Sequence, residues 1–418
     1  MRVFKFGGAS VKDAKSIKNI VTVLQHTGYK NLVVVVSAMG KTTNSLEKVV
    51  TNYFDNLSQV EASVSDVFNY HHSILIDLFS EENHIVYKEI NQLFKELRTF
   101  LKQNKSRNHA FVYDQVVTFG EFISTTIVNR FLESKNIKNT LLDVRTCIKT
   151  DSNFRDAKID WKQTQKEILA IINKNDLTIT QGFLAAETSN NFTTTLGREG
   201  SDYTAAIFAY CLNAESVTVW KDVPGVLNAD PRHFKNTQLL YNISYREAIE
   251  LAFYGATVIH PKTLQPLQRK EIPLYVRSFL NPDEVGSCVG KGVMLNPSVS
   301  CFILKKNQVL ILLSSLDFSF MMEDNIGEVF KLLYKYKMKV ALIQNSAIGF
   351  SVCVDNKFNK LDALLAKLKE RFQVSYFENV TLYTIRHSVP SEIKVLSNGK
   401  DVLLKQETQE TVQLVIQE

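Results

Sequence analysis

The first 37 residues constrain the fold more than any other part of the sequence. Val3–Phe6 is a short apolar run followed by a Gly-Gly pair, and apolar residues from Ala14 to Leu24 then recur at helical spacing. Asn31–Ser37 (NLVVVVS) is a continuous β-branched run, which is typical of a strand buried on both faces. A strand, a helix and a second strand in so short a segment predict a parallel α/β sheet.

A long segment without helix breakers follows. From Lys41 to Phe119 the chain has 79 residues without glycine or proline, and its apolar residues step by three or four. This pattern predicts a helical insert over about residues 41–119. Strand-like runs then return, separated by the helical patterns Ser201–Cys211 and Tyr245–Tyr254; the strand-like runs are Thr140–Val144, Leu177–Gly182, Ser216–Trp220 and Ile272–Val276.

The pattern changes after Pro297, which predicts one domain over residues 1–297 and a second over 298–418. Four strand-like runs and two helical patterns follow in the order β-α-β-β-α-β, which predicts a ferredoxin-like α+β unit. The tail, Ser391–Glu418, predicts strands without a further helix, so a second unit of this kind would be truncated. The runs are Val309–Leu313, Lys339–Gln344, Gly349–Val354 and Thr381–Arg386, and the helices Asn325–Tyr336 and Asn359–Arg371.

Composition narrows the class of protein. The chain has 418 residues, 45% hydrophobic and 22% charged, with a net charge of +6 and no long basic block, so we expect no nucleic-acid partner. Five scattered cysteines without a CxxC pair indicate reduced thiols in a cytoplasmic protein, with neither a disulfide framework nor a protein-held metal. The N-terminus lacks an apolar signal region, and the longest apolar run is too short to span a bilayer, so we expect no membrane partner.

Two glycine-containing segments follow predicted strands. Lys5 lies near the end of the first strand with Gly7 and Gly8 in the turn, where backbone N–H groups and a lysine can bind phosphate. A Gly-Gly pair at a strand-helix junction is more often a plain turn than a phosphate site. In SAMGKTTNS (37–45) a Walker motif is excluded, because its first glycine would fall within the second strand. Ser37 and Thr43 are hydroxyl donors at that strand end or helix caps.

The segment TLGREGSDYTAA (195–206) combines more chemistry than any other. Gly197 and Gly200 break the chain before a helix that opens at Ser201-Asp202, with Arg198 between them. A helix cap would explain Asp202 but not Arg198, whereas an anion site explains both. Elsewhere the residue types decide less. Glu121 is a helix cap or an ammonium ligand, Asp222, Asp230 and Arg232 fit an ordinary long loop, and His260 is expected to be structural.

Six motifs, taken in order, resemble aspartate kinases of the amino-acid-kinase family. The resemblance covers about the first 300 residues, and the rest resembles the ACT regulatory domains of that family. It implies a three-layer α/β/α sandwich with a mostly parallel sheet, and a homodimer formed through the ACT region. It also implies transfer of the ATP γ-phosphoryl group, with Mg²⁺, to the β-carboxylate of L-aspartate, the first step toward lysine, threonine and methionine. The motifs are KFGGAS, VVVVSAMGKTTNSL, TFGEFIST, TLGREGSDYTAA, VWKDVPGVLNADPR and ELAFYGATVIHPKTLQPL.

The resemblance also implies roles for individual residues. Lys5 would stabilise the transferring phosphoryl group, and Asp202 would orient Lys5. The acceptor carboxylate is already ionised at pH 7, so no general base is needed. The remaining residues would act in binding: Gly7, Gly8 and Ser10 along the phosphate path, Lys221, Asp222 and Arg232 at the nucleotide, Arg198 on the α-carboxylate, Glu121 on the ammonium, and Ser37, Thr43 and Ser201 as hydrogen-bond donors.

Several positions depart from the family pattern. Ala9, Glu199, Lys221, Leu227 and Thr257 replace residues common in the family, and Lys221 would partly balance a nucleotide-binding lysine that Thr257 replaces. These changes predict an altered nucleotide site.

A further departure lies in the regulatory region. Ala341 stands where effector-sensing members often carry Asp, which predicts weak or absent inhibition by lysine. Two alternatives to an aspartate kinase remain: a catalytically weak regulatory subunit with ACT domains, and a kinase of another small carboxylate such as glutamate.

Overall fold

The computed structural model describes residues 1–81, 83–256, 259–317 and 319–417. Thr257, one of the five departures named above, lies outside the described residues. The described chain divides into two compact units. Unit 1 contains residues 1–226, 239–249 and 259–297, and unit 2 contains residues 227–238, 250–256 and the described residues from 298 to 417.

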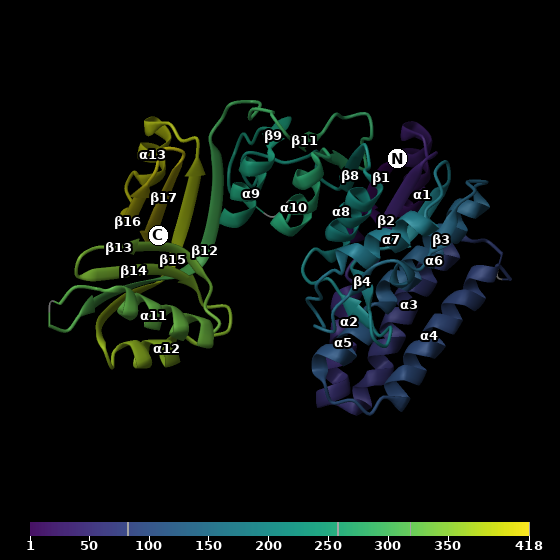
Figure 1. Cartoon of the computed structure of the whole chain (residues 1–418), viewed down its shortest axis with the longest axis horizontal. Coiled ribbons are helices and arrows are strands. Elements are labelled where there is room, and N and C mark those ends of the chain that lie inside the picture. Colours follow the sequence, from purple (N-terminus) through teal and green to yellow (C-terminus); the bar gives the residue numbers. More distant parts are fainter. Residues whose placement is uncertain (82, 257–258, 318, 418) are drawn as a thin grey trace. The chain divides into compact units, whose positions relative to one another are not determined.

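Unit 1 is built on an eight-stranded sheet of order β3-β5-β2-β1-β8-β10-β11-β9. Every neighbouring pair is parallel except β10–β11. This sheet, flanked by helices, confirms the predicted α/β fold (Figure 1). Its strands are β1 (Arg2–Phe6), β2 (Leu32–Val36), β3 (Thr140–Leu142), β5 (Leu177–Gln181), β8 (Ser216–Lys221), β9 (Asn242–Ser244), β10 (Leu274–Ser278) and β11 (Ser287–Gly290).

Four helices occupy the segment for which the sequence predicts helices: α2 (Thr42–Asp55), α3 (Val60–Leu78), α4 (Ile85–Gln103) and α5 (His109–Val117). Asn108 ends the loop before α5 and caps that helix by accepting the N–H groups of Ala110 and Phe111. The other helices are α1 (Ala14–Thr27), α6 (Phe119–Ser134), α7 (Trp161–Ile171), α8 (Gly200–Leu212), α9 (Tyr245–Tyr254) and α10 (Pro261–Lys270).

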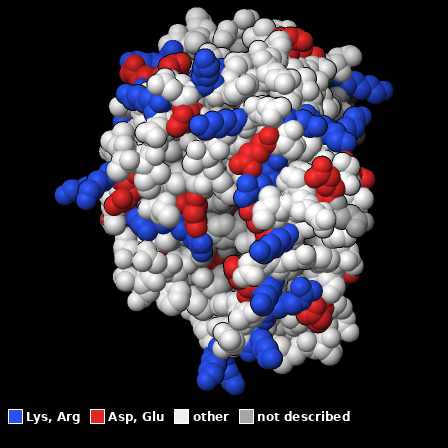
Figure 2. All heavy atoms as spheres, turned by 90° about the vertical axis from the view of Figure 1, so that its right-hand side faces the viewer, with Lys and Arg blue, Asp and Glu red and all other residues white. Residues whose placement is uncertain are grey.

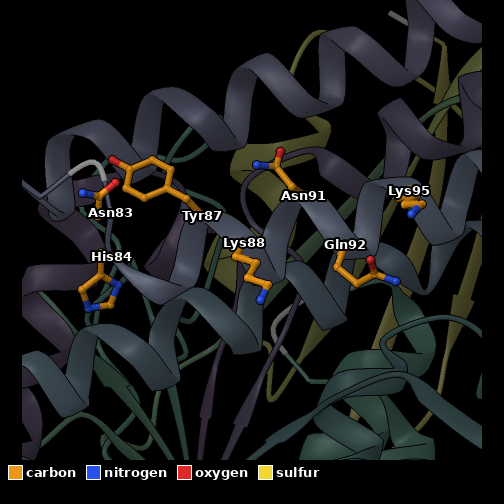
Figure 3. A pocket seen from close by; sticks show the side chains of 7 residues that line it. All are labelled: Asn83, His84, Tyr87, Lys88, Asn91, Gln92 and Lys95. Atoms are coloured by element: carbon orange, nitrogen blue, oxygen red, sulfur yellow. The ribbon is translucent and has the colours of Figure 1, made fainter.

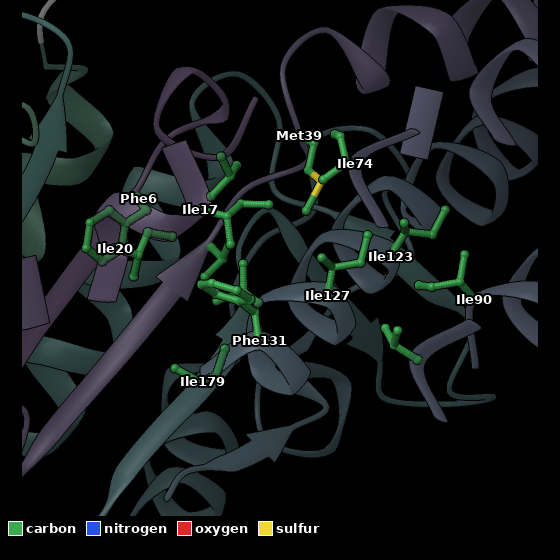
Figure 4. Close-up of a cluster of buried hydrophobic side chains, with 14 of the residues drawn as sticks. Phe6, Ile17, Ile20, Met39, Ile74, Ile90, Ile123, Ile127, Phe131 and Ile179 are labelled. Carbon is green, nitrogen blue, oxygen red and sulfur yellow. The ribbon is translucent and has the colours of Figure 1, made fainter. Parts of the chain in front are cut away.

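The two faces of the central strands carry different side chains, because successive residues of a strand point to opposite faces. Phe4, Phe6 and Trp220 point into a buried apolar cluster shared with helices of the insert. Figure 4 shows part of that cluster, in which Ile17 of α1, Ile74 of α3 and Phe131 of α6 gather beside the sheet. Helix α8 covers the opposite face and packs against β1, β2 and β8. Residues of β1 and β8 that alternate with the apolar ones therefore face α8.

Unit 1 also has a small second sheet, which the sequence does not predict. Along the chain, its strands lie between strands of the first sheet. It consists of β4 (Lys149–Thr150), β6 (Leu184–Glu187) and β7 (Thr193–Thr195) in the order β4-β6-β7. Its strands are two to four residues long, which is too short for a period of two to appear in the sequence. The sheet matters because β7 ends directly before the loop that carries Arg198.

Unit 2 contains a six-stranded sheet of order β13-β14-β12-β15-β17-β16, with all pairs antiparallel. Helices α11 (Glu323–Lys335) and α12 (Leu361–Leu368) lie on one face and share an apolar core with β12, β14 and β15 (Figure 1). The strands are β12 (Cys301–Ser315), β13 (Val340–Asn345), β14 (Gly349–Asp355), β15 (Phe372–Arg386), β16 (Asp401–Glu407) and β17 (Thr411–Gln417).

The prediction that the tail has no helix is wrong. Helix α13 (Pro390–Ser397) precedes β16 and β17. It has Pro390 at its first position, and Glu392 accepts the backbone N–H of Val389, which closes the first turn. Eight residues make barely two turns, too few for a helical apolar period to appear. Among the described residues, no helix is both long and apolar enough to cross a bilayer.

Candidate active site

The carboxyl ends of the central strands meet at one edge of the unit 1 sheet. Phe6 at the end of β1 lies opposite Val36 of β2 and Trp220 of β8, and Val36 lies opposite Gln181 of β5. The segments after these strands are therefore neighbours in space. Open α/β sheets bind ligands at this edge.

A buried charge cluster lies there. Lys5 Nζ is 2.6 Å from Asp202 Oδ1, and Lys221 Nζ is 3.8 Å from Asp202 Oδ2. The exposed fractions of the three side chains are 10% for Lys5, 5% for Asp202 and 22% for Lys221. The resemblance implied that Asp202 orients Lys5, and the structure adds that Lys221, on the neighbouring strand β8, approaches the same carboxylate.

Asp202 is the third residue of α8, with its side chain over the sheet. Burial would raise the pKa of Asp202, but the ammonium groups of Lys5 and then Lys221 outweigh burial and hold that pKa below its ordinary value. Asp202 is therefore ionised at neutral pH. The cluster of three groups has a net charge of +1, which favours a bound anion.

The glycine turn after β1 packs directly on the loop after β2. Gly40 donates its N–H to the carbonyl of Gly8 at 3.0 Å, and a Cβ on Gly8 would lie 2.8 Å from the carbonyl oxygen of Gly40. A side chain at Gly8 would separate the two loops. Ser10 Oγ donates to the carbonyl of Trp220 at 3.1 Å and so links the turn to β8. The Gly7-Gly8 pair thus keeps three loops of the site in contact.

Glu121 is buried in the first turn of α6, with 3% of its surface exposed. Its Oε1 accepts the N–H of Ala38 at 3.3 Å, whereas its Oε2 has no hydrogen-bond partner among the described residues. Burial raises the pKa of Glu121 to about 8, against the opposing effects of the Ala38 N–H and the Lys5 charge. A cation placed at Oε2 would restore the charged form.

The predicted hydroxyl donors and Arg198 lie on loops and helix starts of unit 1. Ser37 follows β2 and donates its N–H to the carbonyl of Phe6, and Thr43 lies in the first turn of α2. Ser201 is buried at the start of α8, where a Cβ on Gly182 would lie 2.5 Å from its Cβ. Arg198 is exposed on the loop before α8. All four belong to unit 1.

Asp222 and Arg232, both predicted to lie at the nucleotide, belong to different units. Asp222 is exposed directly after β8, next to Lys221. Arg232 belongs to unit 2, where its guanidinium forms an ion pair with Asp230 at 2.6 Å. The charge cluster and Asp222 are thus within one unit, and Arg232 is not.

Sequence reasoning missed the residues that hold the Arg198 loop. Asp114 of α5 is fully buried, and its carboxylate accepts the N–H of Thr195 at 2.9 Å, the hydroxyl of Thr195 at 2.8 Å and the N–H of Arg155 at 3.0 Å. Lys262 donates to the carbonyl of Leu196 at 2.9 Å. The signal available in the sequence was a lone carboxylate within the apolar run AFVYDQVV.

The loop after β2 is held by helix α3. His71 is fully buried, with Nδ1 2.7 Å from the carbonyl of Val67 and Nε2 3.3 Å from the hydroxyl of Thr42. Burial lowers the pKa of His71 to about 4, so the imidazole is neutral. Tyr70 donates its hydroxyl to the carbonyl of Lys12 at 2.5 Å. The helical insert therefore supports the loops that carry Ser37, Thr43 and Gly8.

The surface of the insert offers a depression of about 500 Å³ along α4 (Figure 3). Its lining is polar, and Lys88 and Lys95 are the charged side chains among its residues. The face shown in Figure 2 intersperses basic and acidic side chains without a continuous stripe of either sign. None of the predicted site residues lines this depression.

The comparisons with known proteins agree with this geometry. Residues 1–278 match the model of the amino acid kinase family. Lysine-sensitive aspartokinase 3 of Escherichia coli is 31% identical over 364 residues, which cover 84% of this chain and 78% of that protein. The bifunctional aspartokinase/homoserine dehydrogenase of Buchnera aphidicola is also 31% identical, and the match spans 69% of this chain but only 36% of the relative.

Solved structures extend the likeness to both units. Escherichia coli aspartokinase III in complex with lysine and aspartate has a TM-score of 0.83 at 27% identity and covers 99% of this chain and 95% of its own. The complex of that enzyme with aspartate and ADP also has a TM-score of 0.83 at 27% identity, covering 100% and 96%. The chain therefore belongs to the amino acid kinase family and, within it, to the aspartokinases.

Proposed function

We propose that this chain is an aspartate kinase that transfers the γ-phosphoryl group of ATP to the β-carboxylate of L-aspartate. The observation that carries the proposal is the Lys5–Asp202–Lys221 cluster at the carboxyl edge of the sheet, a buried site with net positive charge. Glu121 adds a buried carboxyl group with an oxygen that lacks a hydrogen-bond partner. Together they suit an anionic phosphoryl donor and an amino-acid acceptor.

The reaction needs positioning and charge stabilisation more than proton transfer. A β-carboxylate oxygen of aspartate forms the new bond to the γ-phosphorus, while the bond from that phosphorus to the β,γ-bridging oxygen breaks. The bridging oxygen keeps the electron pair and leaves as part of ADP, and the product is 4-phospho-L-aspartate. The acceptor is already ionised, so Lys5, oriented by Asp202, has the task of stabilising negative charge on the phosphoryl oxygens.

Aspartate would be held by groups of opposite charge at its two other ends. Glu121 pairs with the ammonium group, which supplies the cation that its buried Oε2 lacks. Arg198 binds the α-carboxylate with its guanidinium fork. Ser37, Thr43 and Ser201 donate hydrogen bonds around the substrate.

The nucleotide phosphates would follow the glycine turn. Gly7, Gly8 and Ser10 line this path, and the N-terminus of α8 adds a favourable dipole. Lys221 and Asp222 are assigned to the nucleotide, whereas Arg232, which belongs to unit 2, is not. Mg²⁺ neutralises charge on the phosphates when bound. A bound Mg²⁺ ion would be held by the nucleotide phosphates and by the carboxylate of Asp222, which is exposed directly after β8.

Trapping of the acyl phosphate tests the proposal directly. The protein is incubated with ATP, Mg²⁺, L-aspartate and hydroxylamine, and the aspartyl hydroxamate is measured for wild type, Lys5→Met and Lys149→Met. Lys149 is a matched control, since its partly buried ammonium donates to the backbone carbonyl of Arg145 and to the side-chain oxygen of Asn191 instead of Asp202. We expect product from wild type and Lys149→Met only. Product with glutamate instead of aspartate, or none with either substrate, would overturn the assignment.

We further propose that the chain forms a homodimer through unit 2. Half-buried apolar side chains border the core on the sheet face away from α11 and α12, among them Leu312 and Phe377. Edge strand β13 also exposes Ile343, and edge strands pair readily with other chains. Sedimentation equilibrium should give twice the 47.6 kDa chain mass, and Ile343→Lys should lower the association constant. A monomer at micromolar concentration would contradict this.

A further inference from the structure

Lys221 and Lys5 are presented to the same side of the sheet by strand register. Lys5 of β1 lies opposite Val219 of β8, and Lys221 is two residues farther along β8. Because side chains of a strand alternate between faces, Val219 and Lys221 share the face of Lys5, while Trp220 between them enters the apolar core. Lys221 is therefore built into the site by the strand itself rather than by a loop.

The three groups are held unequally. Lys5 Nζ contacts Asp202 Oδ1 directly at 2.6 Å. Lys221 Nζ is 3.8 Å from Asp202 Oδ2, and the Lys221 side chain is about twice as exposed as that of Lys5. Lys5, Asp202 and Lys221 together carry two positive charges and one negative charge, so these three groups have an excess of one positive charge. Charges at such depth are weakly screened, which makes this excess effective on a bound anion.

We propose that Lys221 is a second catalytic cation, which contacts the phosphoryl oxygens of the nucleotide opposite Lys5 and stabilises the charge that develops during transfer. Asp202 then positions both lysines, one through each oxygen. This inference rests on the proposed function and narrows it, because it assigns Lys221 to the phosphates rather than to the base or the ribose. Arginine would keep the charge at this position, and methionine would keep only the length of the side chain.

The test compares Lys221→Met and Lys221→Arg with Lys270→Met. Lys270 is a matched control, because it is partly buried and binds the carbonyl of Tyr210 and the side chain of Asn213 at the far end of the same helix α8. For each protein, kcat and the KM for ATP are measured, and the affinities for ATP, ADP and AMP are determined by calorimetry. Binding is measured without aspartate, so this arm gives a result even if no turnover with aspartate occurs.

We expect Lys221→Met to lower kcat/KM for ATP by about tenfold to a hundredfold, the effect of losing one charge-assisted hydrogen bond. Affinity for ATP and ADP should fall, affinity for AMP should stay within about twofold, and Lys221→Arg should recover most of the loss. Two results would overturn the inference: Lys221→Met behaving like Lys270→Met, or equal losses for AMP, ADP and ATP, which indicate a structural role. Failure of the proposed function itself would appear differently, as nucleotide binding by wild type without any aspartyl hydroxamate.

Discussion

In the mostly parallel sheet of unit 1, the central strands β1 and β8 each carry a lysine at or next to the carboxyl end, whereas the antiparallel sheet of unit 2 has apolar clusters on both faces. In unit 1, Lys5 and Lys221 face α8 while Phe6 and Trp220 enter the opposite core. In unit 2, one cluster lies under α11 and α12, and another lies on the other face. Parallel strands bring several loops to one edge, and antiparallel hairpins distribute loops over both edges.

The difference shows why chemistry and association belong to different units. At the edge of the unit 1 sheet, residues from three separate segments, β1, α8 and β8, form one charge cluster, and such convergence is what a catalytic site requires. An apolar sheet face with exposed edge strands instead offers area for another protein chain. The following predictions test whether the charged groups of unit 1 carry catalysis while unit 2 serves association with other chains.

The largest effect is expected from Asp202→Asn. This change removes the carboxylate that Lys5 and Lys221 share, so Lys5 loses its 2.6 Å ion pair and Lys221 loses its contact with Asp202. We expect kcat to fall by about 10²–10³, as for loss of a preorganised electrostatic group. Asp143→Asn, which removes a more exposed carboxylate paired with Arg145, is the control and should keep kcat. Retention of more than a tenth of the wild-type kcat in Asp202→Asn would break the proposed role.

The pH dependence of aspartate binding should be the next largest effect. With a pKa of about 8, Glu121 is protonated in the free protein at lower pH and must release a proton to pair with the substrate ammonium. The KM for aspartate should therefore rise by roughly tenfold per pH unit below pH 8. Initial rates between pH 6 and 9 measure this. A KM that does not change over this range would refute it.

Glu121→Gln provides the control, since it should raise the KM for aspartate at every pH and remove the dependence of that KM on pH.

The same variant, Glu121→Gln, should also change the stability of the protein. The folded pKa of about 8 exceeds the unfolded value of 4.5, so the folded state holds an extra proton between these values and loses stability as pH rises through that window. At pH 8 the variant should therefore be more stable than wild type in urea, by at least about 1 kcal/mol.

A smaller effect on activity, with a clear effect on stability, is expected from Asp114→Ala. The change removes three hydrogen bonds to Thr195 and Arg155, so the free energy of unfolding should fall by about 3 kcal/mol. The KM for aspartate should rise several-fold because Arg198 lies three residues beyond Thr195. Urea titration and steady-state kinetics measure the two effects. An unchanged KM for aspartate would show that the hydrogen bonds of Asp114 do not position Arg198.

The smallest effect is expected from lysine. Ala341 lies on β13 and packs against the apolar cluster on the face away from the helices. It offers no carboxylate to an effector ammonium. Millimolar lysine should therefore change the rate by less than about twofold. This is smaller than the change that one hydrogen bond to a charged group would produce. Strong inhibition at lower concentrations would show that unit 2 senses lysine through other residues.

Much of unit 1 could be predicted from the sequence because a central strand such as β2 is a continuous apolar run and its helices are long enough to show a helical period. The strand predicted over Asn31–Ser37 appears as β2 (Leu32–Val36), and the helix predicted over Tyr245–Tyr254 appears with those bounds. The two- to four-residue strands of the β4-β6-β7 sheet and the eight-residue α13 could not be predicted, because segments so short show no period. Their positions depend on tertiary contacts, such as the bond from Val389 to Glu392.

The residues of the candidate site likewise fall into those that the sequence pattern indicated and those that it did not. Lys5, Asp202 and Gly8 were found because each interrupts a regular pattern at a strand or helix end. Asp114 and His71 were missed because they lie inside helices, where a polar residue is usually a solvated one. Their importance comes from burial among partners distant in the sequence: Asp114 contacts a residue 81 positions away. The ion pair of Arg232 with Asp230 could not have been distinguished from a nucleotide contact by sequence.

Trp220 gives the site an optical reporter of its own. The indole is fully buried, stacked on Phe6 and edge-on to Phe4, and it directly precedes Lys221. The chain has one other tryptophan, Trp161, which lies against Tyr203 and Tyr210 of α8. Emission from a buried indole is blue-shifted and sensitive to nearby charge. Replacing Trp161 by phenylalanine would leave a single fluorophore, and its spectrum could follow events at the end of β8 in real time without any added label.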